Sequence, residues 1–301
     1  MTSPGPELPA FRPRAIVSRT LDWYAEHARD LPWRRPGIGG WAVLVSEFML
    51  QQTPVERVRG PWAAWLERWP TPGTLAAVPA GEAVRAWGRL GYPRRALRLH
   101  QAAVMITERF DGEVPTDRPS LLSLPGVGSY TAAAVASFAY GRREVVLDTN
   151  VRRVISRVVL GAAHPSATAP TRLEKAVAER LVPHDPGRAA RWAVASMELG
   201  ALICRARDPR CAKCPVNELC AWRGAGSPPP SGPPRRGQAY AGTDRQCRGA
   251  LLAVLRAADG PVTAGMLARA WPDQVQRNRA LTSLVSDGLV IPVRGRWSLP
   301  R

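Results

Sequence analysis

Lysine is almost absent from this chain of 301 residues: only Lys175 and Lys213 are lysines, and the other basic residues among the 42 Lys and Arg are arginines. Acidic residues number 24, so the formal net charge is +18. A charge of that size and sign predicts a polyanionic partner, and nucleic acid is the commonest one. A membrane-surface protein, or an arginine-rich composition without functional meaning, would also explain the charge. The motifs therefore have to decide between these interpretations.

Long hydrophobic runs are also missing. The longest apolar stretch, Trp41–Leu50, is interrupted by Ser46 and Glu47 and is too short to span a bilayer. Residues 1–14 contain four prolines and no apolar core of signal-peptide length. We therefore expect a soluble, cytoplasmic protein (associated with the nucleoid if bacterial) that has no membrane partner and acts as a monomer.

The first two-thirds of the chain contain no alternating run long enough for a central strand. Apolar residues recur there at intervals of three and four, as in the face formed by Trp62, Trp65 and Trp69, which predicts core packing. Hydrophobic residues make up 45% of the sequence, enough for a sizeable core. The sequence therefore predicts an all-α fold.

Punctuation by proline and glycine divides the chain into four parts. We predict a disordered N-terminus over residues 1–15, a helical core over 16–222 and a linker over 223–242, because its Pro and Gly residues suit neither helix nor strand. Residues 243–301 form a small C-terminal domain. In it we expect helices at 246–257, after a Thr263 cap, and at 275–287, followed by a strand near 296–299. That order is typical of a winged helix, and a small helical cap without a ligand is the alternative.

The first motif is Leu-Pro-Gly-Val-Gly-Ser-Tyr-Thr, residues 124–131, followed by an apolar helix. Gly126 and Gly128 permit a tight turn that exposes backbone amides at the start of a helix. Such amides, aided by the helix dipole, can hold a DNA phosphate without reading sequence. An ordinary turn between helices is the alternative.

Two carboxylates come next. Asp148 follows an apolar stretch and opens a new amphipathic helix, so it can be an N-cap or an anion that stabilises a cationic sugar. Glu47 lies in the middle of a helix that is apolar nearly all round. A buried carboxyl there tends to remain protonated and can act as a general acid for a leaving base, then as a base for water. The alternative is a solvent-facing glutamate at the edge of the helix.

The fourth motif contains four of the five cysteines, at positions 204, 211, 214 and 220. In a chain without a secretion signal, such a cluster indicates a metal site rather than disulfides. Zinc sites usually combine two close pairs of ligands, and only Cys211 and Cys214 are so spaced here. Four thiolates with uneven gaps fit an iron–sulfur cubane at least as well.

Together these motifs resemble the adenine DNA glycosylases of the MutY type, in the endonuclease III, or helix-hairpin-helix, superfamily. The resemblance runs from Leu21 to Trp222, about two-thirds of the chain. It implies a core of two helical lobes with a 4Fe–4S loop over residues 204–220, held by Cys204, Cys211, Cys214 and Cys220. The implied partner is duplex DNA with adenine mispaired with 8-oxoguanine or guanine, and the implied reaction is hydrolysis of the N-glycosidic bond of the adenine.

The resemblance also assigns roles to single residues. Glu47 is similar in position to the acid that protonates the adenine, Asp148 to the carboxylate that stabilises the sugar cation, and Tyr130 to a tyrosine that assists the transition state. The residues that match family contacts to DNA, the phosphate-binding glycines included, are Arg34, Gln52, Thr53, Tyr92, Gly126 and Gly128. Among them, Gln52 and Thr53 match residues that face the 8-oxoguanine, Tyr92 matches the aromatic wedge, and Arg34 matches an arginine near the adenine pocket. Arg205, Arg207 and Arg210 inside the cysteine loop could meet phosphates.

Alternatives remain within and beyond the superfamily. A lyase of the endonuclease III kind needs a lysine for a Schiff base, and this chain has Tyr130 at that position. Thymine or uracil mismatch glycosylases are closer rivals, and a non-catalytic DNA-binding module is a third hypothesis. The chain also departs from the family: Thr149 follows the aspartate where glycine is frequent, and Ala193 and Val194 replace a polar pair near the adenine. In addition, no Nudix-like C-terminal domain is expected after the linker.

Overall fold

The structure is a computed structural model that describes residues 7–230 and 240–301. Residues 1–6 of the predicted N-terminal segment 1–15 and residues 231–239 of the predicted linker 223–242 lie outside the described residues. Contacts divide the chain into two compact units. The unit that we call the Asp148 unit comprises residues 7–38, 116–118 and 128–230. The Glu47 unit comprises residues 39–115, 119–127 and 240–301.

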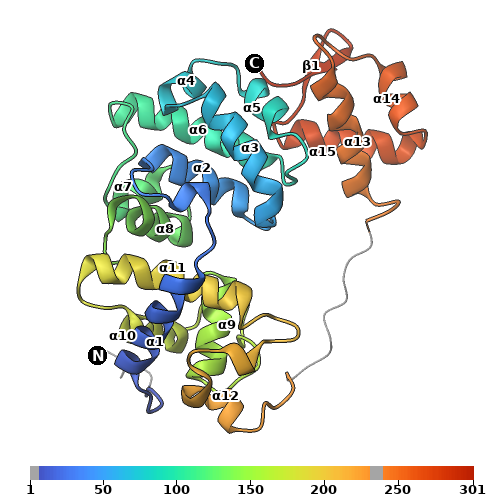
Figure 1. Cartoon of the computed structure of the whole chain (residues 1–301). Coiled ribbons are helices and arrows are strands. Elements are labelled where there is room, and N and C mark those ends of the chain that lie inside the picture. Colours follow the sequence, from blue (N-terminus) through green and yellow to red (C-terminus); the bar gives the residue numbers. More distant parts are fainter. Residues whose placement is uncertain (1–6, 231–239) are drawn as a thin grey trace, which may run out of the picture. The chain divides into compact units, whose positions relative to one another are not determined.

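The described residues form fifteen α-helices, three short 3-10 helices and one two-stranded sheet (Figure 1), which confirms the predicted all-α class. The helices of the Asp148 unit are α1 (Pro13–His27), η1 (Pro32–Arg34), α8 (Ser129–Tyr140), α9 (Thr149–Val158), α10 (Arg172–Leu181), α11 (Pro186–Leu202), η2 (Cys211–Lys213), η3 (Asn217–Leu219) and α12 (Ala221–Gly224). Helix α11 packs against α1, α8 and α9. Apolar side chains of α9 recur at three- and four-residue intervals and enter that core: Val151, Val154, Ile155 and Val158.

The catalytic-core part of the Glu47 unit contains α2 (Gly40–Leu50), α3 (Val55–Arg68), α4 (Pro72–Ala76), α5 (Ala80–Trp87) and α6 (Arg94–Arg109). Helix α7 (Arg118–Ser123) lies almost wholly in this unit. The predicted tryptophan face is buried, and the ring of Trp65 lies 4.7 Å from that of Trp69 and 5.7 Å from that of Trp87. These edge-on aromatic contacts join α3 to α5 and confirm the core-packing interpretation.

The C-terminal residues have the predicted winged-helix order. Helices α13 (Asp244–Ala257), α14 (Ala264–Ala270) and α15 (Gln274–Ser286) precede the strands β1 (Ile291–Val293) and β2 (Arg296–Ser298). The hydroxyl of Thr263 caps α14 by accepting from the Met266 amide. The strands pair antiparallel, and Val262 adds a bridge to Trp297.

This C-terminal module packs directly on helix α5 of its own unit. The Gly81 amide donates to the Pro300 carbonyl at 2.8 Å, and the Arg256 guanidinium donates to the Val84 carbonyl at 2.9 Å. A Cβ on Gly81 would lie 2.4 Å from the Pro300 oxygen, so only glycine permits this approach. Burial lowers the pKa of Arg256 to about 10. The residues after the linker therefore pack against the helices of the Glu47 unit.

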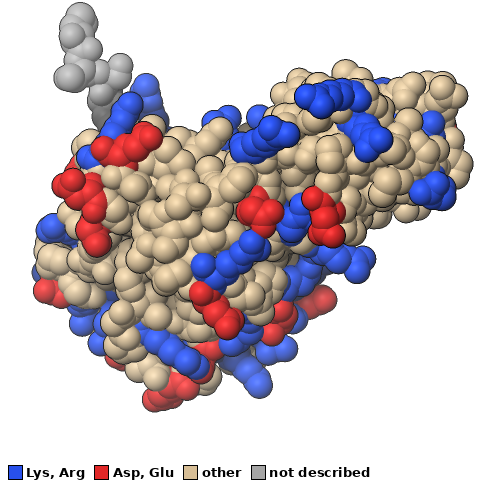
Figure 2. Space-filling view, turned by 90° about the horizontal axis from the view of Figure 1, so that it is seen from above, with Lys and Arg blue, Asp and Glu red and all other residues tan. Residues whose placement is uncertain are grey.

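Basic side chains are spread over the face of the molecule shown in Figure 2, among fewer acidic ones. Within the described residues, no helix has the length and apolar character needed to cross a membrane.

Candidate active site

Glu47 lies in the middle of α2, with 4% of its surface exposed. Its helical neighbours Val43, Leu44 and Phe48 are also buried, because this short helix is apolar on nearly every side. The alternative of a solvent-facing glutamate is therefore wrong. Apolar surroundings favour the neutral form of a carboxyl group, and a proton donor needs that form.

The loop after α2 and the loop before α6 each expose one predicted DNA contact. Gln52 is exposed with φ 55°, and Tyr92 is 53% exposed with φ 46°. Thr53 differs, because it is buried and its hydroxyl donates to the Leu90 carbonyl at 3.2 Å. A DNA contact from Thr53 would have to use its backbone. The structure thus brings Gln52, Thr53 and the Tyr92 loop together in the Glu47 unit.

The glycine turn before α8 has the expected form. Gly126 has φ 82°, and a Cβ there would lie 2.7 Å from Cβ of Arg98 and 2.9 Å from Phe48, so glycine is required by conformation and by space. Gly128 is the N-cap of α8, and no side chain caps that end of the helix. An uncapped helix N-terminus is suited to an anion such as a phosphate.

Asp148 is the N-cap of α9, the structural role anticipated as one of its two roles. Its Oδ1 accepts from the Val151 amide at 2.6 Å, and its Oδ2 accepts from the Asn150 side chain at 2.8 Å. Each carboxylate oxygen has more than one lone pair, so one hydrogen bond to each leaves acceptor capacity for a substrate. Capping and charge stabilisation can therefore coexist in this side chain.

Opposing effects act on the ionisation of Asp148. Burial raises its pKa above the usual value, while the hydrogen bonds from Val151 and Asn150 and the charge of Arg153 act in the other direction. Burial is the stronger effect. The hydrogen bonds from Val151 and Asn150 therefore offset part of the effect of burial, and removing one of them should raise the pKa further.

Tyr130 lies in the first turn of α8 and packs against a small apolar cluster of its unit. That cluster includes Val146, two residues before Asp148, and Ala193 of α11. Ala193 is one of the two residues that replace the family's usual polar pair. The ring of Tyr130 therefore has apolar neighbours from α11 and from the segment before Asp148.

Arg34 is held by an ion pair that the sequence did not predict. Its Nη1 lies 2.7 Å from Oε2 of Glu198, and Nε of Arg29 lies 2.6 Å from Oε1 of the same carboxylate. Glu198 is completely buried in α11. Burial by itself raises the pKa of Glu198, but the hydrogen bond from Arg29 and the charge of Arg34 lower it below the usual value. Arg34 is thus positioned by Glu198, a residue far from it in the chain, which Arg29 also pairs with.

Two buried arginines of α9 support the cysteine loop. Nε of Arg153 donates to the Cys204 carbonyl at 2.7 Å, and its Nη2 donates to the Asn150 side chain at 2.8 Å. Arg157 donates to the Arg205 carbonyl at 2.7 Å, and its Nη1 lies 3.5 Å from Sγ of Cys204. Hydrogen bonds therefore connect Asp148, through Asn150 and Arg153, to the start of this loop.

The four thiols of the loop interact electrostatically. Burial first, and then the charges of Cys204, Cys220 and Cys211, raise the pKa of Cys214 to about 12. Thiolates that interact in this way repel one another, so a nearby cation favours their joint ionisation. Among the described residues, no three His, Cys, Asp or Glu side chains form a group that could hold a metal ion as they lie. Thiols are ligands of zinc and of iron–sulfur clusters, and four of them lie in this one loop.

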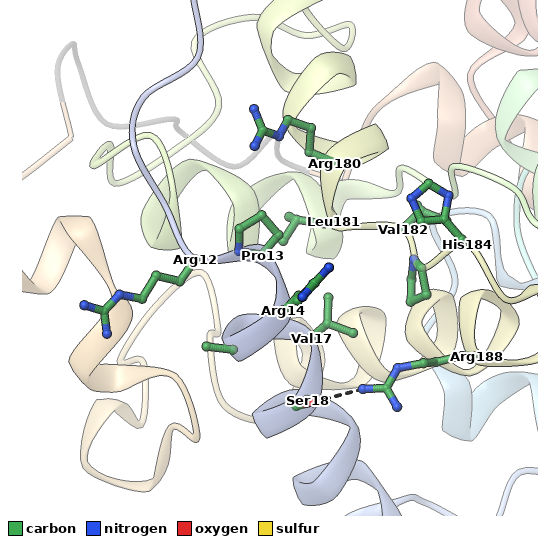
Figure 3. A pocket seen from close by; sticks show the side chains of 12 residues that line it. Arg12, Pro13, Arg14, Val17, Ser18, Arg180, Leu181, Val182, His184 and Arg188 are labelled. Atoms are coloured by element: carbon green, nitrogen blue, oxygen red, sulfur yellow. Dashed lines mark hydrogen bonds between the residues drawn. The ribbon is translucent and has the colours of Figure 1, made fainter.

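A separate cavity of about 830 Å³ lies in the Asp148 unit, between the start of α1 and the segment that joins α10 to α11 (Figure 3). No carboxylate lines it within the described residues, and Arg188 donates to the Ser18 hydroxyl at 2.9 Å. Its cationic lining residues are Arg12, Arg14, Arg180 and Arg188, and His184 also lines it. None of the predicted site residues lines this cavity, so it is distinct from the candidate active site.

The predicted site residues divide between the two units. Glu47, Gln52, Thr53, Tyr92 and Gly126 belong to the Glu47 unit. The residues of the Asp148 unit are Arg34, Gly128, Tyr130, Asp148, Cys204, Cys211, Cys214 and Cys220.

Four residues that hydrogen-bond to predicted site residues or to the cysteine loop were not predicted from the sequence: Arg95, Asn150, Arg153 and Glu198. Only Asn150 carried a local signal, because an amide two residues after an N-cap aspartate can donate to it. Each of the other three also has a partner more than 40 residues away in the chain, which no local pattern predicts.

Comparison with known proteins agrees with the motifs. The profile of the HhH-GPD superfamily base excision DNA repair proteins matches residues 45–180. The adenine DNA glycosylase of Mycobacterium tuberculosis is 54% identical over 98% of this chain and 97% of its own length. The thymine-DNA glycosylase of Aeropyrum pernix is 35% identical over 70% of this chain and 95% of its own length.

The solved structure of a thermostable thymine-DNA glycosylase has a TM-score of 0.65 and 28% identity, covering 71% of this chain and 97% of that one. The match to the Mycobacterium protein is higher in identity and extends over the C-terminal module as well. The chain therefore belongs to the adenine DNA glycosylases of the HhH-GPD superfamily, enzymes of base excision repair that bind DNA and act on adenine.

Proposed function

We propose that this enzyme hydrolyses the N-glycosidic bond of adenine that is mispaired with 8-oxoguanine or guanine in duplex DNA, and leaves the DNA strand intact. The observation that carries the proposal is the burial of Glu47 within apolar helix α2, because an adenine becomes a good leaving group only when a ring nitrogen is protonated. Reaching a base in a duplex requires its extrusion from the stack.

In the proposed reaction, Glu47 donates its proton to a ring nitrogen of the extruded adenine. The bond between that base and C1′ of the sugar then breaks, and the electron pair leaves with the base. Asp148 faces the sugar cation as an anion, as carboxylates do in glycoside hydrolysis, and Tyr130 assists the transition state. Water then forms a bond to C1′ and returns one proton to Glu47.

The absence of a suitable lysine supports hydrolysis without strand cleavage. A lyase forms a Schiff base between a lysine amine and the sugar. The family position for that amine holds Tyr130, and the only lysines of the chain are Lys175 and Lys213. Lys175 is an exposed residue of α10, and Lys213 belongs to the cysteine loop.

We assign recognition of the opposite base to the exposed residues of the Glu47 unit. Tyr92 is the wedge, since an exposed aromatic ring can offset about 1–3 kcal/mol of lost base stacking. Gln52 faces the 8-oxoguanine with its side chain, and Thr53 contributes through its backbone. Gly126 and Gly128 form the turn at the N-terminus of α8, and the backbone amides there bind a phosphate.

Cys204, Cys211, Cys214 and Cys220 are proposed to hold a 4Fe–4S cluster. Its support is the mutual electrostatic contact of four thiols in one loop. When bound, the cluster supplies the cation that allows four thiolates to coexist, and we assign it a structural role in bracing the loop. A protein that contains iron, with visible absorbance that bleaches on reduction or oxidation, is expected. A colourless protein with stoichiometric zinc would contradict this assignment.

The decisive experiment is single-turnover cleavage of four duplexes, which carry adenine opposite 8-oxoguanine, adenine opposite guanine, thymine opposite guanine, and uracil opposite guanine. Products are analysed with and without alkali, for the wild-type enzyme and for Glu47→Gln. We expect release of adenine alone, strand breakage only after alkali, and loss of release in the variant.

Other results would point elsewhere. Release of thymine would assign the enzyme the activity named for its Aeropyrum pernix relative, and release of uracil would assign it to the mismatch glycosylases that act on uracil. Strand breakage without alkali would indicate a lyase step. Equal cleavage of adenine opposite either purine would remove the proposed role of Gln52 in reading 8-oxoguanine.

A further inference from the structure

Arg95, the second residue of α6, is buried, with 8% of its surface exposed. Its guanidinium reaches the C-terminal end of α2, where Nη1 donates to the carbonyls of Phe48, Met49 and Gln51 at 2.8, 3.1 and 2.5 Å. The last carbonyls of a helix have no partner inside the helix. Arg95 therefore caps α2 from outside, directly before Gln52.

The same guanidinium holds the loop that carries the wedge. Its Nη2 donates to the Gly91 carbonyl at 3.0 Å and to the Thr53 hydroxyl at 3.1 Å. The Thr53 hydroxyl in turn donates to the Leu90 carbonyl at 3.2 Å. The guanidinium carbon also lies 5.4 Å from the centre of the Tyr92 ring. The loop after α2 and the loop before α6 therefore share one buried charged group.

Backbone strain occurs at the two residues that these contacts flank. Gln52 and Tyr92 both have positive φ, at 55° and 46°, although neither is glycine. Residues in this region persist only where the surroundings over-determine their conformation, and such strain concentrates at functional sites. The residues immediately before them, Gln51 and Gly91, are both bonded to Arg95.

We infer that Arg95 is a positioning residue that holds Gln52 and Tyr92 as one rigid reader of the base opposite the target adenine. The inference rests on the proposed function and deepens it, because it predicts that the two contacts act together. Their contributions to DNA binding should be energetically coupled, and the coupling should depend on Arg95.

Arginine has the shape that is needed to hold both loops at once. Its planar guanidinium has five N–H donors in a fixed fork, whereas the lysine ammonium has three donors and no fork. Acceptors on both loops surround Arg95, so lysine could not satisfy both at once. Burial lowers the pKa of Arg95 to about 10, so that it stays charged at neutral pH.

The test is a double-mutant cycle of Gln52→Ala and Tyr92→Ala, made with Arg95 intact and again with Arg95→Lys. All proteins carry Glu47→Gln, and the affinity for a duplex with adenine opposite 8-oxoguanine is measured. With Arg95 present we expect the effects of the two substitutions to depart from additivity by on the order of threefold or more. With lysine at position 95 we expect additive effects.

Hydrogen exchange of the folded proteins provides a second measurement that does not depend on binding. We expect Arg95→Lys to speed amide exchange in residues 50–53 and 90–92 together. The matched control is Arg109→Lys, at the exposed end of the same helix, which should change neither the coupling nor the exchange.

Persistent coupling in Arg95→Lys, or faster exchange in only one loop, would overturn the inference. If Arg95→Lys does not fold, exchange in Thr53→Val, which removes the hydroxyl between the two loops, is measured instead with the same expectation. A wild-type enzyme that releases no adenine would refute the proposed function and leave the exchange result, which concerns the loops alone, still interpretable.

Discussion

The two carboxylates proposed for the chemistry have contrasting surroundings. Glu47 lies within a helix that is buried and apolar on nearly every side. Asp148 lies at a helix N-terminus, where an amide and an asparagine side chain donate to its oxygens. Burial acts against ionisation of a carboxyl group at both positions, and at Asp148 two hydrogen-bond donors oppose that effect. Two similar side chains can thus take different roles because their environments differ.

Buried arginines serve the same purpose in both units. In the Asp148 unit, Arg152 pairs with Glu174 at 3.0 Å and donates to the carbonyls of residues 167–169, and Arg157 donates to the cysteine loop. In the Glu47 unit, Arg95 donates to carbonyls of two loops. Part of the arginine excess is therefore structural, because guanidinium groups satisfy the carbonyls of irregular loops.

The largest expected effect follows from the contrast between the carboxylates. We expect Glu47→Gln and Asp148→Asn each to lower the single-turnover rate of adenine release by about 10²–10⁴-fold. If the two groups act in one step, the double variant should lose far less than the product of the two factors. Full multiplication of the two losses would show that the groups act independently. Duplex affinity and circular dichroism serve as controls for binding and folding.

The sequence was sufficient where the signal is local. The cap at Thr263, the capping position of Asp148 and the burial of Glu47 could be predicted, because each depends on neighbours within one helix. The partners of Arg95 in and after α2, and the arginines that pair with Glu198, could not, since they lie more than 40 and 160 residues away respectively. Periodicity identifies the face of a helix that is buried, but it does not identify the partner that a long-range polar group will find.

The Arg29–Glu198–Arg34 cluster should give the next largest effect. Replacing Glu198 by Gln leaves two partly buried guanidiniums without their anion, and breaking a buried pair in this way costs about 3–5 kcal/mol. Because the folded-state pKa of Glu198 is lowered, this stability is present above the unfolded pKa and is lost as pH falls through the folded value. The variant and wild type should therefore differ in urea unfolding at neutral pH and converge in acid.

The control for that comparison is Glu218→Gln, which removes an exposed pair with Arg19. Exposed ion pairs contribute little. A similar loss of stability in both variants, or a difference from wild type that persists in acid, would contradict the assignment to the buried cluster.

A smaller effect should come from the donor that stabilises Asp148. Asn150→Ala removes the hydrogen bond to Oδ2, so the pKa of Asp148, already raised by burial, should rise further. The acid limb of the pH–rate profile should then move to higher pH, because at any given acidic pH a larger fraction of the enzyme has a neutral Asp148. The neighbouring, exposed Thr149→Ala is the matched control. An unchanged acid limb in Asn150→Ala would mean that this limb reports another group.

The smallest effect concerns the cationic cavity of the Asp148 unit. Its arginines lack carboxylate neighbours among the residues that line it, so Arg12→Gln with Arg14→Gln removes two charges that are available to DNA phosphates. If each contacts a phosphate, the slope of log K against log salt should become shallower by about 0.9 per contact. The control is Arg19→Gln with Arg35→Gln, which removes two charges that are already paired with Glu218 and Asp30. Equal changes in both double variants would assign the effect to net charge alone, whereas a change confined to Arg12 and Arg14 would assign a DNA contact to the cavity.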